Sequence, residues 1–399
     1  MRVLYLNPFS QEVSGPDESL RTLLGDLIPR GVEAHVVLPA AGPQVPRYQA
    51  LGARVHFAPL SVLRRDLSLD AATYPLRLAR STVAVAALAR SVEADLIHTN
   101  MEVLLEGVFA STLLRKPHVL HYRGNTLDRP KIVFDALVAT WTRGADRVYC
   151  ISGATAEVFR RRGHRDKVEV LYNPIDLAAF GPASPSPEVR ATLGGRPGQP
   201  LVGTVGRIHP RKDLETFVRA AAAVARAVPE TRFAIIGSAE AEVELAYQER
   251  LSRLVTELGL ADHLTFAGAR RDIPAVMRSL DLFVLTSRHE GFGRVVAEAM
   301  AAARPVVVTE EGALPELVAD GPAGLCAAPG EADAFAQQIL RLLRNPPDAA
   351  AFGTRARDAA RKFDATTIGA RVWDRYRQLT GAADRHPFKR SAEPSARAR

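Results

Sequence analysis

An alternation of short apolar runs with helical patterns begins at the first residues and constrains the fold more than any other feature. The runs at 3–6 and 36–38 read as buried strands, and residues 18–30 between them place leucines on one helical face. Strands and helices that alternate in this way form a parallel sheet covered on both faces. The first half of the chain is therefore predicted to be a doubly wound α/β domain.

A second domain is indicated because this alternation stops and then starts again. Residues 181–200 are rich in proline and glycine, a composition that suits an interdomain linker. The apolar run at 201–205 then opens a new series of strands and helices. We expect an N-terminal domain at 1–180 and a C-terminal domain at 201–355, and we expect residues 381–399, which lack apolar periodicity, to form a disordered basic tail.

Composition and charge narrow the class of protein. Hydrophobic residues make up 47% and charged residues 24%, as in ordinary soluble globular proteins. The net charge of +8 is modest for 399 residues, so anionic ligands are expected and nucleic acid is not. Cys150 and Cys326 lie far apart and suit free thiols in a reducing compartment. Because no apolar run approaches the roughly 20 residues that span a bilayer, and the first run is too short for a signal peptide, we expect a cytoplasmic protein.

Two glutamates flank a predicted phosphate cradle within residues 281–308. This segment reads as strand, polar turn, helix and strand, and the sequence Gly-Phe-Gly at 291–293 ends the turn. Unpaired N–H groups and the dipole at the start of a helix favour an anion. Glu290 precedes the cradle and Glu298 follows it on the helix, so the stretch predicts an anion site with a carboxylate on each side.

Two cations form a second motif in the loop that follows the strand at 201–205. Arg207 and Lys212 are five residues apart, and a loop of this length can bring both onto one diphosphate. Taken alone, the pair could equally be two exposed loop charges. The pair and the two glutamates are expected at the same edge of one sheet, which favours a shared site.

Polar residues also stand at predicted strand ends in the first half. His98 and His121 end two strands, and Arg123 follows the second, at the sheet edge where open α/β sheets bind ligands. Each histidine taken singly is explained as well by a structural role. Gly15, after the first strand, allows either a close phosphate or a plain turn. Ser152 reads as a helix N-cap.

Residues 59–93 form a long predicted helical region in which arginines interrupt apolar residues. These arginines are Arg64, Arg65, Arg77, Arg80 and Arg90. A surface helix pair with a solvated basic face explains the pattern. A basic amphipathic surface would also attract anionic lipid, so peripheral contact with a membrane is a second interpretation.

Together these motifs resemble those of the retaining glycosyltransferases of family 4 (glycosyl transferases group 1), which have the GT-B fold. The resemblance covers residues 1 to about 380 and is strongest over 201–326. In the second half it is carried by Gly206-Arg207, Lys212, Phe266-Ala267-Gly268, Ser287, Glu290 to Gly293, Glu298-Ala299-Met300, Arg304 to Val307, Leu314-Pro315-Glu316 and Gly321, and in the first half by Gly15, His98, Ser152, Asn173 and Asp176.

The resemblance implies an α/β protein with two Rossmann-like doubly wound domains that face each other across a cleft. The N-terminal domain would bind the acceptor, and the C-terminal domain would bind a nucleotide sugar. Helices at 356–380 would cross back onto the N-terminal domain, a family feature that periodicity alone does not show.

Roles in donor binding follow from the same resemblance. Arg207 and Lys212 would hold the diphosphate and stabilise its charge as the glycosidic bond breaks. Glu290 would hold sugar hydroxyls, and Glu298 would accept hydrogen bonds from the ribose. Backbone groups would reach the donor at Phe292, Gly293, Arg294 and Val295, and the nucleobase would be lined by Ala269 and Arg270.

In the N-terminal domain, Gly15 would let the first loop touch the diphosphate from the other side. Either His121 or Arg123 would face the transferred sugar, with His121 favoured and Arg123 kept as an acceptor or phosphate contact. Ser152 and Asn173 would also line the substrate site.

The resemblance further implies a mechanism that needs no metal, no cofactor and no dedicated general base. The departing phosphate, stabilised by Arg207 and Lys212, would itself take the acceptor's proton on the same face of the sugar. The sequence departs mildly from the family pattern at Ser14-Gly15, Ala302-Ala303 and Gly312-Ala313, where glycines are common.

Three functions other than glycosyl transfer fit parts of this pattern. A sugar-nucleotide epimerase of the same fold and a non-catalytic nucleotide-sugar-binding protein stay as alternatives. A dinucleotide-dependent dehydrogenase is disfavoured because no Gly-x-Gly-x-x-Gly follows the first strand. The donor sugar, the nucleobase and the acceptor stay open, since a lipid-linked sugar, a polysaccharide precursor or a small metabolite would all fit.

Overall fold

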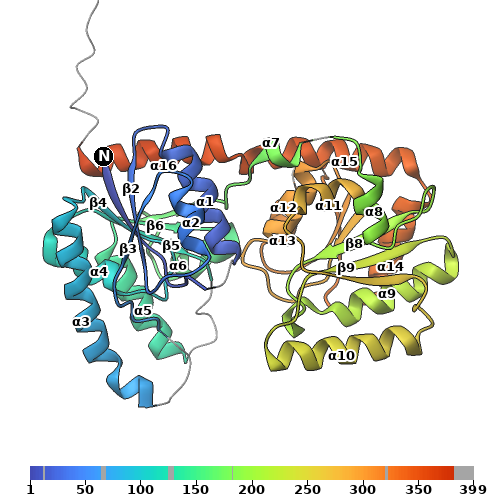
Figure 1. Cartoon of the computed structure of the whole chain (residues 1–399), viewed down its shortest axis with the longest axis horizontal. Coiled ribbons are helices and arrows are strands. Elements are labelled where there is room, and N and C mark those ends of the chain that lie inside the picture. Colours follow the sequence, from blue (N-terminus) through green and yellow to red (C-terminus); the bar gives the residue numbers. More distant parts are fainter. Residues whose placement is uncertain (12–13, 64–68, 125–129, 182, 320–321, 382–399) are drawn as a thin grey trace, which may run out of the picture.

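The N-terminal half of the computed structural model is a seven-stranded parallel sheet with helices on both faces (Figure 1). The structure describes residues 1–11, 14–63, 69–124, 130–181, 183–319 and 322–381. The strand order is β3-β2-β1-β4-β5-β6-β7, and the strands are β1 (Arg2–Leu6), β2 (Glu33–Leu38), β3 (Arg54–Phe57), β4 (Leu96–Thr99), β5 (His118–Tyr122), β6 (Arg147–Cys150) and β7 (Val168–Val170).

Alternation along β1 explains why both faces of this sheet are covered. Val3 and Tyr5 belong to the core on one face, and Leu4 and Leu6 to the core on the other. The helices that follow the strands are α1 (Gly15–Leu27), α2 (Gln44–Gln49), α3 (Leu69–Ser91), α4 (Glu106–Leu114), α5 (Lys131–Gly144), α6 (Gly153–Arg160) and α7 (Leu177–Phe180).

The predicted helical region at 59–93 is only partly helical. Residues 59–63 are not in a helix, and the described helix, α3, runs from Leu69 to Ser91 with Pro75 inside it. The expected helix pair is formed instead by α3 and α4, which pack on each other. Arg64 and Arg65 lie outside the described residues.

The C-terminal half repeats the architecture with six parallel strands in the order β10-β9-β8-β11-β12-β13. The strands are β8 (Leu201–Val205), β9 (Arg232–Ile236), β10 (Leu264–Gly268), β11 (Leu282–Leu285), β12 (Val306–Thr309) and β13 (Leu325–Ala327). The helices are α8 (Pro187–Thr192), the 3-10 turn η1 (Pro210–Lys212), α9 (Leu214–Ala227), α10 (Glu242–Glu257), α11 (Ile273–Ser279), α12 (Arg294–Ala301), α13 (Leu314–Val318), α14 (Ala332–Leu343), α15 (Pro346–Ala360), the 3-10 turn η2 (Arg361–Phe363) and α16 (Ala365–Thr380).

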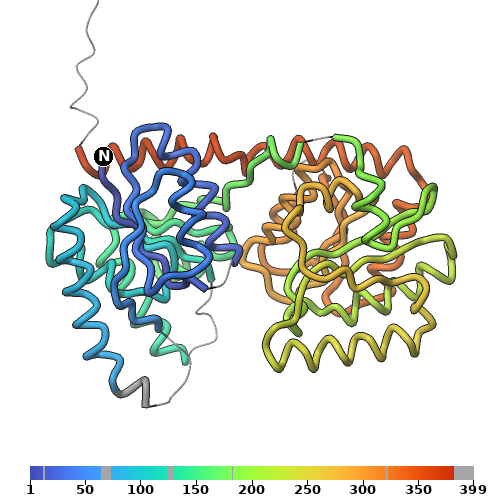
Figure 2. Tube along the Cα trace, in the orientation of Figure 1, coloured from blue at the N-terminus to red at the C-terminus, as the bar shows by residue number. Residues whose placement is uncertain are grey.

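The last helix, α16, returns to the N-terminal half, and the red end of the trace runs along both halves in Figure 2. Ile368, Val372 and Tyr376 are fully buried in the same core as Val3 and Tyr5. The predicted tail beyond residue 381 lies outside the described residues. The sheets and the returning helix confirm the predicted GT-B class of two Rossmann-like halves.

The chain passes between the two halves twice, and the two passages lie side by side. The Ile175 N–H donates to the Phe363 carbonyl at 2.8 Å, and the Ala365 N–H donates to the Ile175 carbonyl at 3.0 Å. This paired crossing is called the hinge below. Within the described part of the chain, no helix combines the length and the apolar character that crossing a membrane requires.

Candidate active site

The predicted phosphate cradle forms at the start of α12. Gly293 has φ +86° and an added Cβ would lie 2.5 Å from Leu314 Cδ2, so the turn requires glycine. The N-cap residue of α12 is Gly293 itself, which has no side chain to accept from the first N–H groups. The first N–H groups of the helix are therefore available to an anion, which the positive end of the helix dipole also favours.

One predicted cation contacts the predicted carboxylate that directly precedes this cradle in the chain. Lys212 Nζ forms an ion pair with Glu290 Oε1, and these side chains are 26% and 15% exposed. Thr286 Oγ1 donates to the carbonyls of Lys212, at 3.0 Å, and Asp213, at 2.9 Å. Residues that follow β8 and β11 are thus brought together as the two motifs indicated, and Thr286 fixes the turn that carries Lys212.

Arg207 has a partner that the sequence did not reveal. Its Nη1 lies 3.5 Å from Oε1 of Glu244, a buried residue in the first turn of α10. Glu244 Oε2 accepts from the N–H groups of Glu240, at 3.0 Å, and Ala241, at 3.3 Å. Burial raises the pKa of Glu244, but these N–H groups and Arg207 outweigh it and bring the pKa below its usual value. The acidic residue in the first helical turn was visible in the sequence, whereas its pairing with Arg207 depends on the fold.

Glu298 is buried beneath the cradle and is paired with Arg294. Oε1 of Glu298 lies 2.9 Å from Nε of Arg294. Burial raises the pKa of Glu298 to about 7, with Arg294 opposing the shift and Glu18 adding to it. Nη1 of Arg294 also reaches the N-terminal half, where it donates to Ser19 Oγ at 3.1 Å and to the Pro174 carbonyl at 2.9 Å. Arg294 therefore connects the cradle to α1 and to the hinge.

On the N-terminal side, Arg123 is buried in a network of loops at the carboxyl edge of the sheet. Its guanidinium donates to the Asn100 carbonyl at 2.8 Å, to Asn100 Oδ1 at 2.6 Å and to Asn173 Oδ1 at 2.6 Å. Its backbone N–H donates to Glu102 Oε2 at 2.9 Å. Burial lowers the pKa of Arg123 to about 10. Two predicted residues, Arg123 and Asn173, are therefore in direct contact.

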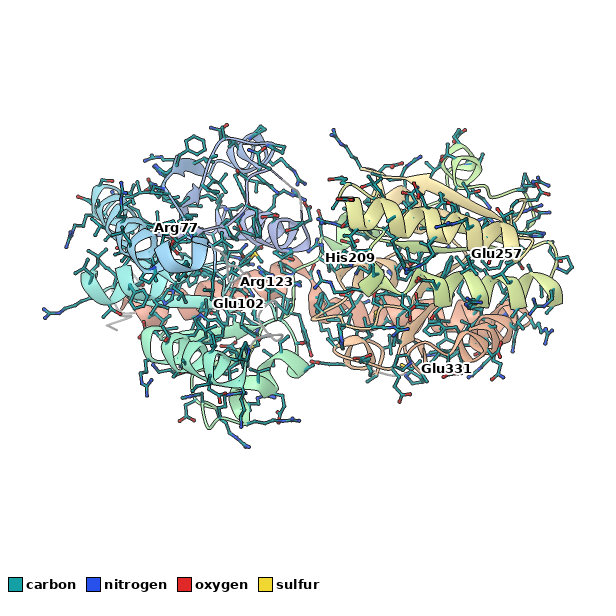
Figure 3. All side chains as sticks on the ribbon, turned by 90° about the horizontal axis from the view of Figure 1, so that it is seen from below. Arg77, Glu102, Arg123, His209, Glu257 and Glu331 are labelled. Atoms are coloured by element: carbon teal, nitrogen blue, oxygen red, sulfur yellow. The ribbon has the colours of Figure 1, made fainter. Side chains whose placement is uncertain are left out.

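This network faces the cradle across the junction of the two halves. A Cβ added to Gly291 would lie 3.1 Å from the Arg123 carbonyl oxygen, so the two loops touch. Figure 3 shows Arg123 and Glu102 in the N-terminal half and His209 in the C-terminal half, on the sides by which the halves meet.

The structure places His121 in the core of the N-terminal half, whereas Arg123 lies in the loops at the sheet edge. His121 is 1% exposed, and its ring lies 5.5 Å from that of His98 and 5.6 Å from that of Tyr149. His98 Nδ1 is hydrogen-bonded to the Tyr376 hydroxyl of α16. Burial, followed by Arg123, lowers the pKa of His121 well below 6.5. The reason is strand geometry: His121 points to the face covered by α16, whereas Arg123 lies just past the strand end.

The other predicted residues take varied positions. Ser152 caps α6, with its Oγ accepting from the Thr155 N–H at 3.1 Å. Arg270 binds Asp272, with Nε to Oδ1 at 2.8 Å, so its guanidinium is engaged next to Ala269 at the end of β10. The remaining three are Gly15, whose added Cβ would meet open space at the start of α1, Phe292, which is buried in the cradle, and Val295, half-buried in the first turn of α12.

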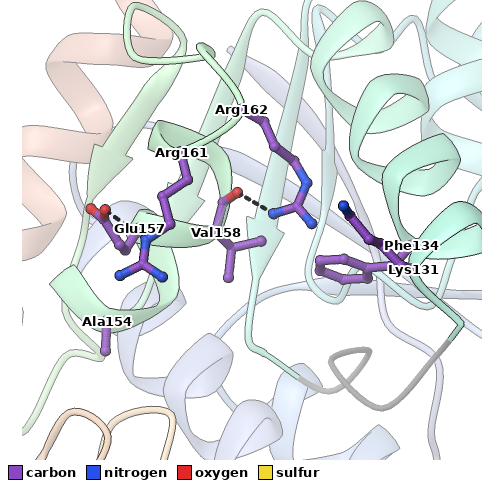
Figure 4. Close-up of a pocket in the computed structure, with 7 residues that line it drawn as sticks. All are labelled: Lys131, Phe134, Ala154, Glu157, Val158, Arg161 and Arg162. Atoms are coloured by element: carbon purple, nitrogen blue, oxygen red, sulfur yellow. Dashed lines mark hydrogen bonds and ion pairs between the residues drawn. The ribbon is translucent and has the colours of Figure 1, made fainter.

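A groove that the sequence did not indicate lies beside the junction on the N-terminal half (Figure 4). It has a volume of about 400 Å³ between α5 and α6, and its lining includes Lys131, Phe134 and Arg161. Ala154 also lines it, one residue after the start of α6. Among the described residues, no cluster of His, Cys, Asp or Glu side chains could hold a metal ion. Gly321, one of the motif residues, lies outside the described residues.

Comparison with known proteins places these features in a family. The family model for glycosyltransferase family 4 matches residues 13–179, and that for glycosyl transferases group 1 matches residues 186–359. The lipopolysaccharide core biosynthesis mannosyltransferase LpcC of Rhizobium leguminosarum is 34% identical over 50% of this chain and 58% of its own length. The chain spans about half the length of several other curated relatives.

Two further comparisons extend over nearly the whole chain. The 2-deoxystreptamine N-acetyl-D-glucosaminyltransferase of Streptomyces fradiae is 28% identical, over 96% of this chain and 98% of its own. HepE of Anabaena, solved in complex with UDP, superposes with a TM-score of 0.80 and 26% identity, over 95% of this chain and 100% of its own. The chain belongs to the family-4 glycosyltransferases of the GT-B fold.

Proposed function

We propose that the protein transfers a sugar from a nucleoside diphosphate sugar to a hydroxyl group of an acceptor, with retention of configuration. The observation that carries this proposal is the pairing of Lys212 with Glu290, close to Arg207, beside the uncapped start of α12. Cations and free N–H groups at one point suit a diphosphate, and the adjoining carboxylate suits sugar hydroxyls. The complex of HepE with UDP supports the same class of donor.

In the proposed reaction, the bond between the anomeric carbon and the phosphate oxygen breaks while the diphosphate is held by Arg207, Lys212 and the cradle. The acceptor oxygen forms its bond to the same face of that carbon. Its proton passes to the departing phosphate oxygen, so no protein base is required. The protein contributes charge stabilisation and positioning. No metal and no cofactor is part of this mechanism, and unchanged turnover in the presence of a chelator would support that.

The remaining residues have proposed roles in binding. Glu298 would release Arg294 and accept hydrogen bonds from the ribose hydroxyls. Backbone groups of residues 292–295 would reach the sugar and phosphates. Ala269 and Arg270 would contact the base through their backbone. Arg123 would border the transferred sugar in place of His121.

On the N-terminal domain, Gly15 would approach the diphosphate. Ser152, the N-cap of α6, would hold the loop that precedes this helix. The acceptor would bind there, with the groove between α5 and α6 as its outer surface. The N-terminal domain would span residues 1–180 and the C-terminal domain residues 201–355, with the linker at 181–200 between them. The helices at 356–380 would cross back to the N-terminal domain.

Screening of nucleotide sugars by thermal shift, followed by a transfer assay, tests the proposal. A donor at 100 times its dissociation constant stabilises the protein by about 2.7 kcal/mol, which is readily detected. Proton NMR of the product shows whether the anomeric configuration is kept. Interconversion of the donor to its epimer without transfer would favour an epimerase, and tight binding without turnover would favour a binding protein.

We also propose that the outer face of the N-terminal domain makes peripheral contact with anionic lipid. Large apolar side chains are exposed on α3, α4 and α5, namely Leu76, Val83, Phe109, Leu113, Ile132 and Val133. Exposed basic residues lie on α3 and just after α4, namely Arg80, Arg90, Arg115 and Lys116. In Figure 1, α3 and α4 lie on the side of this domain away from the C-terminal domain. Apolar contact and attraction to anionic headgroups would act together.

Co-sedimentation with vesicles tests this contact. Binding should require anionic lipid, weaken with salt, and fall in a variant with Leu76→Ser and Val83→Ser. Equal binding to neutral vesicles, or none to anionic ones, would contradict it. The proposed location is cytoplasmic, at the inner face of the membrane, which suits the free thiols of Cys150 and Cys326.

A further inference from the structure

A carboxylate of the C-terminal domain lies at the start of a helix of the N-terminal domain. Glu316, in α13, accepts from the Gly153 N–H, at 3.0 Å to Oε1 and 2.8 Å to Oε2. Oε1 also accepts from the Tyr172 hydroxyl at 2.7 Å. Gly153 is the first residue of α6, where the helix dipole favours a negative charge. One acid from one domain is thus held by two donors from the other.

The approach at this contact is tight. A Cβ added to Gly153 would lie 3.1 Å from Oε2 of Glu316 and 3.3 Å from its Cδ. A side chain here would displace the carboxylate by a few tenths of an ångström. Gly291, in the cradle, shows the same tightness against the Arg123 carbonyl and Ile151 Cδ1, at 3.1 and 3.3 Å from an added Cβ. Small residues on each side of the junction therefore permit one closely fitted arrangement of the domains.

The same contact is linked to the cradle and to the hinge by aromatic packing. The ring of Tyr172 lies 6.0 Å from that of Phe292, the middle residue of the cradle, and 5.2 Å from that of Phe363, in the hinge. Phe292 and Phe363 pack edge to face at 5.3 Å. Tyr172, whose hydroxyl donates a hydrogen bond to Glu316, therefore packs against Phe292 in the cradle.

This arrangement matters because the reacting groups come from different domains in the proposed function. Transfer requires the acceptor oxygen within about 3–3.5 Å of the anomeric carbon, and a misplacement of about 1 Å costs on the order of 100-fold in rate. A donor held by the C-terminal domain and an acceptor held by the N-terminal domain meet this requirement only if the relative position of the two domains is fixed.

We propose that Glu316 is a positioning residue that, through its contacts with Gly153 and Tyr172, fixes the relative position of the two domains in which transfer occurs. This proposal rests on the proposed function, and Glu316 itself touches neither substrate. It acts on the acceptor's distance from the donor and leaves donor binding, most of whose proposed contacts belong to the C-terminal domain, largely unchanged.

The test compares Glu316→Ala and Glu316→Gln with the matched change Glu331→Ala, an exposed residue just before α14. Donor affinity is measured by calorimetry, and transfer and donor hydrolysis by product assay. In Glu316→Ala we expect transfer kcat to fall about 10- to 100-fold, with donor affinity and hydrolysis by water within about threefold of the wild type. The Gln variant should recover part of the loss, because its amide oxygen still accepts both hydrogen bonds.

Hydrogen exchange provides a readout that is independent of activity. Amides at 153–156 should exchange faster in Glu316→Ala than in the wild type or in Glu331→Ala, while the melting temperature stays close to that of the wild type. Unchanged exchange would overturn the contact, and unchanged transfer with faster exchange would overturn the positioning role. If the wild type transfers no sugar from any donor, the proposed function fails, and the exchange data still decide whether the contact exists.

Discussion

Replacing Lys212 with methionine removes one positive charge from the proposed diphosphate site and keeps most of the side chain's length. The Nζ group lies against Glu290 in a partly buried position, with 26% of the side chain exposed. At an effective dielectric constant of about 20, two charges 4 Å apart interact by roughly 4 kcal/mol. The ammonium of Lys212 would therefore stabilise the negative charge that develops on the departing phosphate.

The expected loss of kcat in Lys212→Met follows from the effect of removing similar groups. Removal of one preorganised donor to a developing oxyanion typically costs about 2.7–4 kcal/mol, a factor of about 100 to 1,000 in kcat. Donor binding should weaken less, because Arg207 and the start of α12 also contact the diphosphate. Lys212→Met should therefore lower kcat far more than it raises the dissociation constant of the donor.

The assay is steady-state transfer with the best donor from the screen, paired with calorimetric titration of that donor. Lys116→Met, which changes an exposed lysine after α4, is the control for loss of a positive charge. Circular dichroism confirms that each variant is folded. If kcat of Lys212→Met stays within about threefold of the wild type, Lys212 does not stabilise the leaving group and the assignment fails.

Three further predictions concern single residues. Glu244→Gln should loosen Arg207 and raise the dissociation constant of the donor about tenfold, measured by calorimetry, with an unchanged value counting against the pairing. The pKa of Glu298 is about 7 in the folded state, against an ordinary value of about 4.5. This group therefore binds more protons in the folded than in the unfolded state between these values, so its contribution to stability falls as pH rises from 4.5 to 7. Glu298→Gln should remove this pH-dependent part, worth up to about 3 kcal/mol, from urea unfolding curves at pH 5 and 8, and identical pH profiles would contradict the shift. Ala303 has φ +57°, where glycine is favoured, so Ala303→Gly should raise the free energy of unfolding by about 1 kcal/mol, and a lower melting temperature would refute the argument.

The sequence predicted the architecture because its patterns are local. The predicted strands at 3–6, 36–38 and 201–205 correspond to β1, β2 and β8, the predicted helix at 18–30 corresponds to α1, and the Gly-Phe-Gly motif at 291–293 lies at the start of α12 as expected. Arg207, Lys212 and Glu290 could be grouped because parallel strands place the loops after them at one edge of the sheet.

What the sequence could not supply were relations between segments distant in the chain. His121 and Arg123 differ by two positions, but the choice between them depends on where the strand ends and which face α16 covers. The partner of Glu316 lies 163 residues away in the other domain. No periodicity records such a contact. The same holds for Glu244 and Arg207, whose pairing depends on how α10 packs.

The return of α16 has a consequence for how the protein is made. Ile368, Val372 and Tyr376 complete a core that begins with Val3 and Tyr5, so the N-terminal domain, which is synthesised before the C-terminal domain, is completed only after it. The C-terminal domain has all of its described strands and α14 once residue 343 has been synthesised, while the face of the N-terminal sheet that α1 covers still lacks the side chains of α16. A chain that stopped at residue 364 would lose stability in its N-terminal domain, although the missing residues lie at the opposite end of the sequence. Nascent N-terminal domains would therefore need protection from association until the final helix arrives.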